Sequence, residues 1–295
     1  MTDTFGARLR RAMDERGALC VGIDPHAALL LDWGLNDDVG GLETMAMTVV
    51  EALAGQVSVL KPQSAFYERF GSRGIAVLEK VIAASRAAGA LVLLDVKRGD
   101  IGSTSQAYAD AYLDPASPLA VDAITVSPYL GFGSVQPMID TAIRHRAGVF
   151  VLALTSNKEG PEVQHATGPD GRTVAGAVLD HLRTLNADAT PMGSFGAVVG
   201  ATIGDTEESL DINGPLLAPG FGAQGGTPGR HPCRRAAGVR GPVCERAAEL
   251  VARDSPCRPV GHRAPRGCPA HAGGDRQDLT PDLGCPALQR GWTTD

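Results

Sequence analysis

The chain has 295 residues, of which 43% are hydrophobic, and its formal net charge of −6 argues against nucleic acid or an anionic membrane as main partner. Aromatic residues make up 4%, so aliphatic side chains must fill most of the core. No stretch approaches the roughly 18 apolar residues of a membrane span, and the segment MTDTFGARLRRAMDERG lacks the apolar run of a secretory signal, which predicts a cytoplasmic protein.

Up to about residue 220, short apolar runs alternate with longer amphipathic stretches, an order typical of parallel β/α repeats. We expect strands at 19–24, 57–61, 90–97, 123–128, 148–154, 196–201 and 215–219. We expect helices at 42–54, 74–88, 103–113, 135–146 and 173–186. Seven β/α repeats in regular order favour an α/β fold of the TIM (β/α)₈ barrel type. No Gly-x-Gly-x-x-Gly follows the first strand, which weakens a dinucleotide-binding alternative.

The composition changes at Gly229. From there to the end the chain has 11 Arg but no Lys, 8 Pro, 9 Gly and five of the six cysteines. Only 244–253 has a helix-like pattern, and no convincing eighth strand is present. We therefore expect a barrel domain over 1–228, whose last β/α unit is missing or disrupted, and an atypical tail over 229–295 that buries little apolar surface. A reading-frame change near residue 229 in GC-rich DNA would encode such a tail.

The strongest chemical signal is the segment DVKRGDI, which ends the most apolar run of the chain. Because side chains alternate along a strand, Asp95 and Lys97 point to one side of the sheet. Asp100 falls in the loop that follows. Inward-facing charges at the carboxyl end of a barrel strand lie where the active sites of such barrels are found.

Two earlier strands also end in charge. Asp24 ends the first strand in VGIDPH, and Lys61 ends the second in VSVLKPQSAF. One such residue is compatible with a solvated strand end and incidental ion pairs. Charges at the same end of three consecutive strands favour a shared functional site.

The Asp-x-Lys-x-x-Asp pattern of Asp95, Lys97 and Asp100 resembles the signature of orotidine 5′-phosphate decarboxylases, and the resemblance covers roughly residues 5–228. Ile101 and Thr104 continue that signature. The spellings DVKRGDIG, SPYLGFGS and TSNKEG are similar to the longer bacterial, mycobacterial-type subgroup.

Other matches to this family lie on other strands. Lys61 matches the lysine that completes the family's Lys-Asp-Lys-Asp array, and Ser127 in TVSPYLG matches the serine that contacts the pyrimidine. Pro219 and Gln224 in APGFGAQGG match the segment that closes over base and phosphate.

The resemblance implies decarboxylation of orotidine 5′-phosphate without metal or other cofactor. Lys97 would stabilise the C6 carbanion and deliver the proton, and Asp95 would lie near the departing carboxylate. Asp24 and Lys61 would hold ribose hydroxyls. In the family, the residues matching Asp100, Ile101 and Thr104 reach the neighbouring subunit's site, which implies a homodimer with shared active sites.

The chain departs from the family at its end. The family's phosphate-binding arginine on the eighth strand or its helix has no clear counterpart, because the surroundings of Arg246 and Arg253 do not match. A lost eighth unit would leave the barrel open. Two alternatives therefore stay open: a related magnesium-dependent sugar-phosphate lyase or aldolase with the same motif, and a catalytically impaired remnant.

Overall fold

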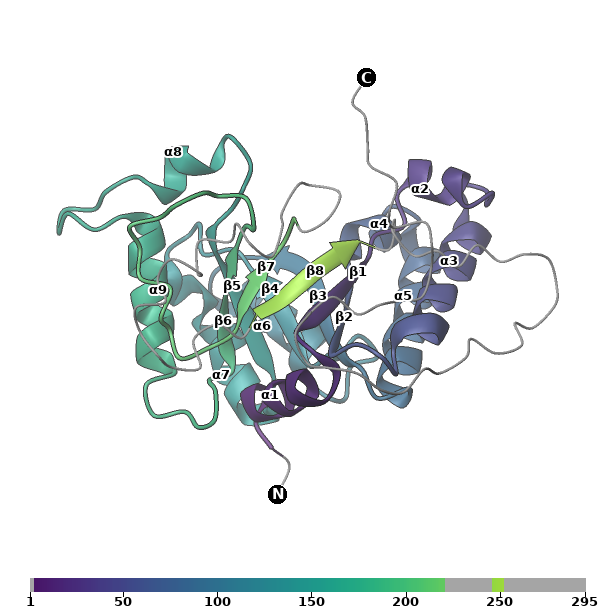
Figure 1. Ribbon diagram of the computed structural model, residues 1–295, viewed down its shortest axis with the longest axis horizontal. Coiled ribbons are helices and arrows are strands. Elements are labelled where there is room, and N and C mark those ends of the chain that lie inside the picture. The colour runs from purple at the N-terminus through teal and green to yellow at the C-terminus, as the bar shows by residue number, and fades with distance from the viewer. Residues whose placement is uncertain (1–2, 221–245, 252–295) are drawn as a thin grey trace, which may run out of the picture. The chain divides into compact units, whose positions relative to one another are not determined.

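The computed structural model of the chain describes residues 3–220 and the backbone of residues 246–251, all within one unit, Met1–Ala252. Within those residues, eight parallel strands close into a barrel in the order β1 to β8 (Figure 1). The first seven are β1 Leu19–Ile23, β2 Val59–Pro62, β3 Leu91–Arg98, β4 Ala123–Val126, β5 Gly148–Leu154, β6 Phe195–Val199 and β7 Leu216–Ala218. Each bound lies within two residues of its expected position, so the expected α/β barrel is confirmed.

Five long helices occupy the places that the sequence predicts: α3 Val39–Leu53, α5 Gly71–Ala87, α6 Gly102–Leu113, α7 Gln136–His145 and α9 Val174–Leu185. Side-chain caps help to define two of their starts, because Asp38 and Thr173 accept hydrogen bonds from the first-turn N–H groups of α3 and α9. Shorter elements that the sequence analysis did not predict are α2 Ala27–Asp32, α4 Ser64–Glu68, α8 Gly160–Gln164 and the 3₁₀ helix η1 Phe132–Val135.

The repeat is less regular than expected between β6 and β7. Residues 200–214, all of them described, contain no helix. This connection includes Gly204 and Asn213 at positive φ. Its buried apolar side chains are those of Ala201, Leu210 and Ile212. A segment with so few apolar positions cannot form an amphipathic face against the sheet.

The strands separate two layers of apolar side chains. Outward-facing residues pack with the surrounding helices, and they include Val21, Leu60, Leu94, Ile124, Val151, Val199 and Leu216. Inward-facing residues form a second cluster, and they include Cys20, Val59, Leu93, Ala123, Phe150, Val198 and Leu217. This alternation with a period of two residues is the arrangement that fills a parallel barrel.

Helix α1, Phe5–Arg16, was also not predicted, and it covers the end of the barrel where the strands begin (Figure 1). Its buried Phe5, Leu9 and Met13 join the inward-facing cluster. The Phe5 ring meets the Phe150 ring edge-on at 6.1 Å between centroids. A Cβ at Gly148 would lie 2.3 Å from the same Phe5 ring, so glycine is needed at the start of β5 for this helix to dock.

The eighth strand, β8 Arg246–Val251, corrects the helical interpretation of 244–253. It pairs in parallel with β7 through Leu216↔Arg246 and with β1 through Leu19↔Ala248. Without it, the edges of β7 and β1 would leave backbone N–H and C=O groups unpaired, and pairing on both sides outweighs a local helical preference. The rest of the eighth unit lies outside the described residues, as does the boundary expected at 228/229, and β8 lies beyond that boundary.

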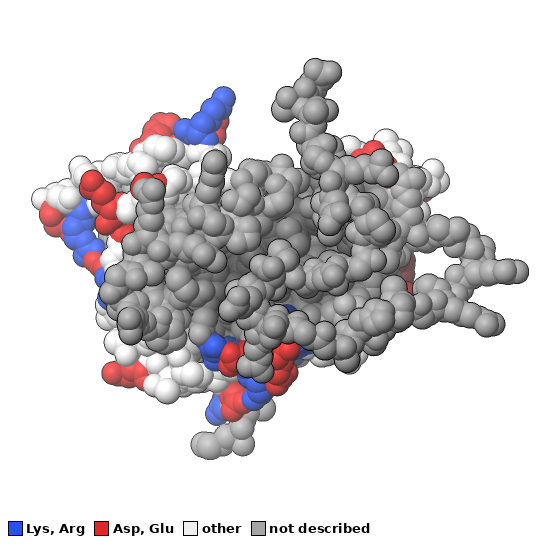
Figure 2. Space-filling model, viewed as in Figure 1, with Lys and Arg blue, Asp and Glu red and all other residues white. Residues whose placement is uncertain are grey.

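Acidic and basic side chains are interspersed around α1 on the face that Figure 2 shows. Among the ion pairs of α1 and the residues just before it, Arg10 pairs with Asp14 and Arg11 pairs with Asp3. Among the described helices, none combines the length and the apolar character needed to cross a bilayer.

Candidate active site

The inward-facing side chains change character toward the carboxyl ends of the first four strands, a region called the barrel mouth below. One or two steps of two residues beyond the apolar layer, the same inner face carries Asp24 after β1, Lys61 on β2, Asp95 and Lys97 on β3, and Thr125 on β4. The alternation of strand side chains therefore delivers these groups to one region.

Lys61, Asp95 and Lys97 form a contiguous ion-pair array at this mouth. The Lys61 Nζ lies 3.1 Å from Asp95 Oδ2, and the Lys97 Nζ lies 2.6 Å from Oδ1 and 2.7 Å from Oδ2. The side chains of Lys61 and Asp95 are 1% and 7% exposed, whereas that of Lys97 is 45% exposed. The buried Asp95 carboxylate thus contacts both ammonium groups and holds that of Lys97 at the edge of the site.

The Asp95 carboxylate is strongly acidic in this environment. Burial by itself would raise its pKa, but the charges of Lys61 and Lys97, with hydrogen bonds from Lys97 and Thr125, lower the pKa to about 2. Asp95 is therefore ionised throughout the physiological pH range.

Thr125 is part of this array and lies outside the set of site residues predicted from the sequence. Its Oγ1 donates a hydrogen bond to Asp95 Oδ1 at 2.6 Å and accepts one from the backbone N–H of Lys97 at 3.0 Å. The signal was present in the sequence AITVSP, because a period of two places Thr125 and Ser127 on the same face of the strand.

Asp24 follows β1 directly and is half-buried. Its negative charge, added to the larger effect of burial, raises the pKa of the Tyr67 phenol, which places the carboxylate near the fully buried Tyr67 on α4. The Asp24 side chain is thus at the mouth, near Tyr67 of α4.

The other motif residues on β3 lie in the loop and helix that follow the strand. Asp100 Oδ1 accepts a hydrogen bond from the N–H of Ile101 at 2.8 Å. The described residues include no ion pair between Asp100 and Lys97. Ile101 is 62% exposed at the start of α6, and Thr104 is exposed in its first turn. Within one chain, these residues therefore lie beside the array rather than in it.

Ser127 and Pro219 follow β4 and β7 at the same end of the barrel. The Ser127 N–H donates to the carbonyl of Arg98 at 2.8 Å, which ties it to the residue after Lys97. The Pro219 carbonyl accepts a hydrogen bond from Ala201 at 2.8 Å. Gln224 lies outside the described residues.

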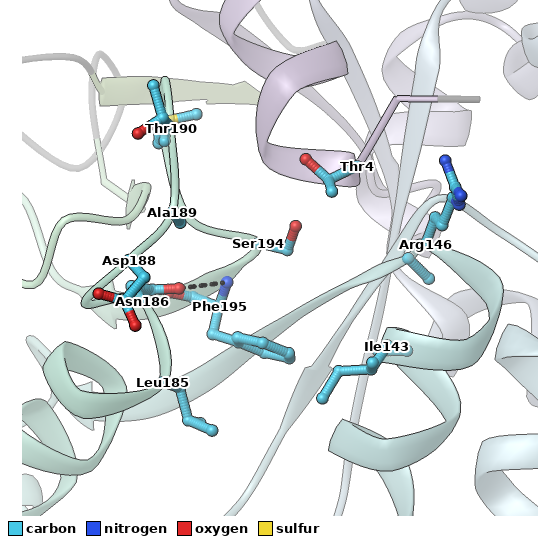
Figure 3. A pocket seen from close by; sticks show the side chains of 13 residues that line it. Thr4, Ile143, Arg146, Leu185, Asn186, Asp188, Ala189, Thr190, Ser194 and Phe195 are labelled. Atoms are coloured by element: carbon cyan, nitrogen blue, oxygen red, sulfur yellow. Dashed lines mark hydrogen bonds between the residues drawn. The ribbon is translucent and has the colours of Figure 1, made fainter. Parts of the chain in front are cut away.

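A cavity of about 380 Å³ lies at the opposite end of the barrel (Figure 3). Its lining includes Thr4, Ile143, Arg146 and Phe195, which are near the starts of α1, β5 and β6. Lys61, Asp95 and Lys97 do not line it. We assign the candidate site to the mouth because buried, mutually fixed charges are found there, and cavity size alone carries no chemistry.

The array at the mouth can stabilise negative charge and supply a proton. Lys97 presents an ammonium to solvent, and its position is restrained by Asp95. Such a preoriented cation stabilises an anion without having to reorganise during the reaction. Among the described residues, no group of three or more His, Cys, Asp or Glu side chains is placed to hold a metal ion.

Comparisons with known proteins agree on one family. The model of the "Orotidine 5′-phosphate decarboxylase / HUMPS family" matches residues 17–232. An orotidine 5′-phosphate decarboxylase of Nocardioides is 76% identical over 226 residues, which is 76% of this chain and 83% of that protein. One of Streptomyces coelicolor is 66% identical over 227 residues, or 77% of this chain and 82% of that protein.

Solved structures give the same result. A crystal structure assigned as an orotidine 5′-phosphate decarboxylase from Streptomyces avermitilis is 60% identical, with a TM-score of 0.82 over 87% of this chain and 90% of that chain. The OMP decarboxylase of Leishmania donovani is 28% identical, with a TM-score of 0.63 over 85% of this chain and 90% of that chain.

Proposed function

The chain belongs to the orotidine 5′-phosphate decarboxylase / HUMPS family, and on that premise we propose that it converts orotidine 5′-phosphate to uridine 5′-phosphate in pyrimidine synthesis. The observation that carries the proposal is the Lys61–Asp95–Lys97 array at the barrel mouth. An ammonium held in place at the barrel mouth suits a reaction that generates negative charge on carbon.

The decarboxylase is favoured over the sugar-phosphate lyase or aldolase alternative. The description of the family model covers more than one enzyme, but seven relatives that are 51–76% identical to this chain are named orotidine 5′-phosphate decarboxylase. The regions aligned with these relatives include the Asp-x-Lys-x-x-Asp motif of Asp95, Lys97 and Asp100.

The proposed chemistry assigns the central step to Lys97. The bond between C6 and the carboxylate breaks, carbon dioxide leaves, and the electron pair stays on C6. The Lys97 ammonium stabilises that carbanion and transfers a proton from Nζ to C6, after which solvent reprotonates the amine. The reaction consumes one proton and requires no electron acceptor, so the proposal includes no cofactor.

Asp95 and Lys61 support this step. Asp95 holds Lys97 through two contacts of 2.6 and 2.7 Å. The buried Lys61 ammonium balances the negative charge of Asp95. In the proposal, Asp95 also lies near the substrate carboxylate. Asp24 and Lys61 bind ribose hydroxyls, because both reach the mouth from neighbouring strands.

Further contacts complete the proposed site. Ser127 contacts the pyrimidine, and Pro219 with Gln224 closes over base and phosphate. Two subunits share their sites, and Asp100, Ile101 and Thr104 enter the partner's mouth. The exposure of Ile101 supports this arrangement, as does the lack of an ion pair between Asp100 and Lys97 among the described residues of one chain. The homodimer, the cytoplasmic location and the domain division at 228/229 stay predictions.

The test is a direct assay of the purified full-length chain. Addition of the chain to orotidylate should cause a loss of orotidylate absorbance, and the rate of that loss should not change when a metal chelator is present. A folded chain that gives no turnover would contradict the proposal and support the impaired-remnant alternative. A rate that depends on added magnesium would favour the sugar-phosphate alternative. Growth of uracil-requiring cells on expression of the chain provides a second readout.

A further inference from the structure

Thr125 lies where the pairing between β3 and β4 is irregular. The strands pair at Leu94↔Ile124 and again at Arg98↔Val126, so Asp95, Val96 and Lys97 all lie opposite Thr125. Such a bulge leaves backbone groups without their usual ladder partners and re-aims the side chains of the longer strand. Both catalytic candidates of β3 are in this bulge.

We infer that Thr125 is a positioning residue that fixes the Lys97–Asp95 pair in its reactive geometry, an inference that rests on the proposed function. The side chain is 1% exposed, so water does not compete for its hydrogen bonds. Its hydroxyl occupies the place of the missing strand partner and bonds to the backbone of one residue and the side chain of the other.

The donor and acceptor capacities of a hydroxyl explain why threonine suits this position. A hydroxyl has one proton to donate and can accept at the same time. Here the proton goes to Asp95 Oδ1, and the oxygen accepts from the Lys97 N–H, so both capacities are used in one chain of hydrogen bonds. Consecutive bonds of this kind polarise and strengthen one another.

The Lys97 backbone needs such restraint. Its φ is 42°, in the left-handed region that side-chain-bearing residues rarely adopt. The hydrogen bond from Lys97 N–H to Thr125 holds this conformation, which lets the ammonium turn back onto Asp95. Loss of the hydroxyl would free the backbone and would leave Asp95 Oδ1 with one of its two recorded donors.

The experiment compares Thr125→Val with Thr125→Ser in the full-length chain. Valine has the shape of threonine without the hydroxyl, and we expect kcat to fall about 10- to 100-fold with a smaller change in KM. Serine restores the hydroxyl and should recover most of that loss. Thr141→Val is the matched control, because Thr141 is also fully buried and hydrogen-bonded but lies on α7, with Gln106 and Arg144 as partners.

A readout independent of turnover separates positioning from stability. The charged groups recorded against Asp95 among the described residues are Lys61 on β2 and Lys97 on β3, and both remain in Thr125→Val. The only change at the carboxylate is then the lost hydrogen bond from the Thr125 hydroxyl, which favours the ionised form. A carboxyl carbon NMR titration should show the pKa of Asp95 raised by about one unit in Thr125→Val. Thr141→Val should leave that pKa at its wild-type value even if it destabilises the fold.

The inference is overturned if Thr125→Val keeps wild-type kcat, if serine fails to restore activity, or if the Asp95 pKa moves equally in both valine variants. Absence of turnover in the wild-type chain would count against the proposed function instead. In that event the titration still decides whether Thr125 positions the pair, so the two failures are distinguishable.

Discussion

The two ends of the barrel are built from different kinds of side chain. Where the strands begin, Phe5, Leu9 and Met13 of α1 pack against an apolar interior. Where the first strands end, the same interior carries Lys61 and Asp95, both almost fully buried. The change takes place within one step of two residues along β2 and β3, so a single alternating pattern supplies both the packed core and the charged site.

The difference teaches how such a fold divides stability and function. Burying an apolar side chain contributes about 1.5–3 kcal/mol, whereas desolvating two charges costs more than their attraction returns unless the geometry is good. The mouth is therefore the end that is optimised for chemistry. The cavity of Figure 3 lies at the other end and has no comparable array of charges in its lining.

The largest effect should come from removing the exposed ammonium at the mouth. Lys97→Ala is expected to lower kcat at least about 1,000-fold, because it removes both the cation that stabilises the carbanion and the proton donor. Circular dichroism should show a retained fold. Lys80→Ala, an exposed lysine on α5, is the control and should turn over normally. Near-normal decarboxylation by Lys97→Ala would end the proposed mechanism.

Asp95→Ala should impair both activity and stability. It removes the carboxylate beside the buried Lys61 and releases Lys97, so we expect kcat to fall about 100-fold or more and unfolding free energy to fall by about 3–5 kcal/mol. Urea denaturation and the absorbance assay measure the two effects. The control is Asp140→Ala, which changes an exposed aspartate on α7 and should lower neither kcat nor the unfolding free energy to this extent. Normal turnover by Asp95→Ala would contradict the array.

A substitution at the opposite end should separate stability from activity. Leu9→Ala creates a cavity under α1 and should lower the unfolding free energy by about 2–5 kcal/mol, since Leu9 is fully buried. The kcat of the folded protein should stay within about twofold of wild type. Leu31→Ala, at an exposed leucine on α2, provides the control for stability. A large fall in kcat would show that the two ends are coupled.

The acid dependence of stability should reveal Asp95. Its pKa is lowered from 3.8 to about 2 in the folded chain, so its contribution of about 2 kcal/mol is complete above the unfolded pKa. That contribution is lost as pH falls through about 4 to 2, where the unfolded state takes up the proton first. Asp95→Asn should remove this part of the pH dependence in denaturation curves. An unchanged slope in that window would show that Asp95 is not the group responsible.

The smallest effect is expected at the cavity of Figure 3. Asp188 is exposed and lines it, and Asp188→Ala should change stability by less than about 0.5 kcal/mol and leave turnover unaffected. The absorbance assay with the matched wild-type preparation measures this. A marked loss of activity would mean that the starts of the strands contribute to the reaction.

Much of the fold could be predicted because its signals are local. A strand buried on both faces is a continuous apolar run, and β5 was located at both of its ends. The Asp95 and Lys97 side chains share a face for the same local reason, and the predicted meeting of these residues with Lys61 followed from parallel strands ending together. The short helices α2, α4 and α8 escaped prediction because one turn or two carry too little periodicity.

The sequence by itself determined which residues form the first seven strands and which of them bring charge to the mouth, because alternation and apolar runs act over a few neighbouring positions. Tertiary structure alone decided that Arg246–Val251 is a strand, since only the open edges of β7 and β1 demand one there. It also decided the bulge that brings Thr125 to Asp95 and Lys97, and the low pKa of Asp95. Those properties depend on groups about 30 residues away along the chain, whose approach is set by the pairing of whole strands.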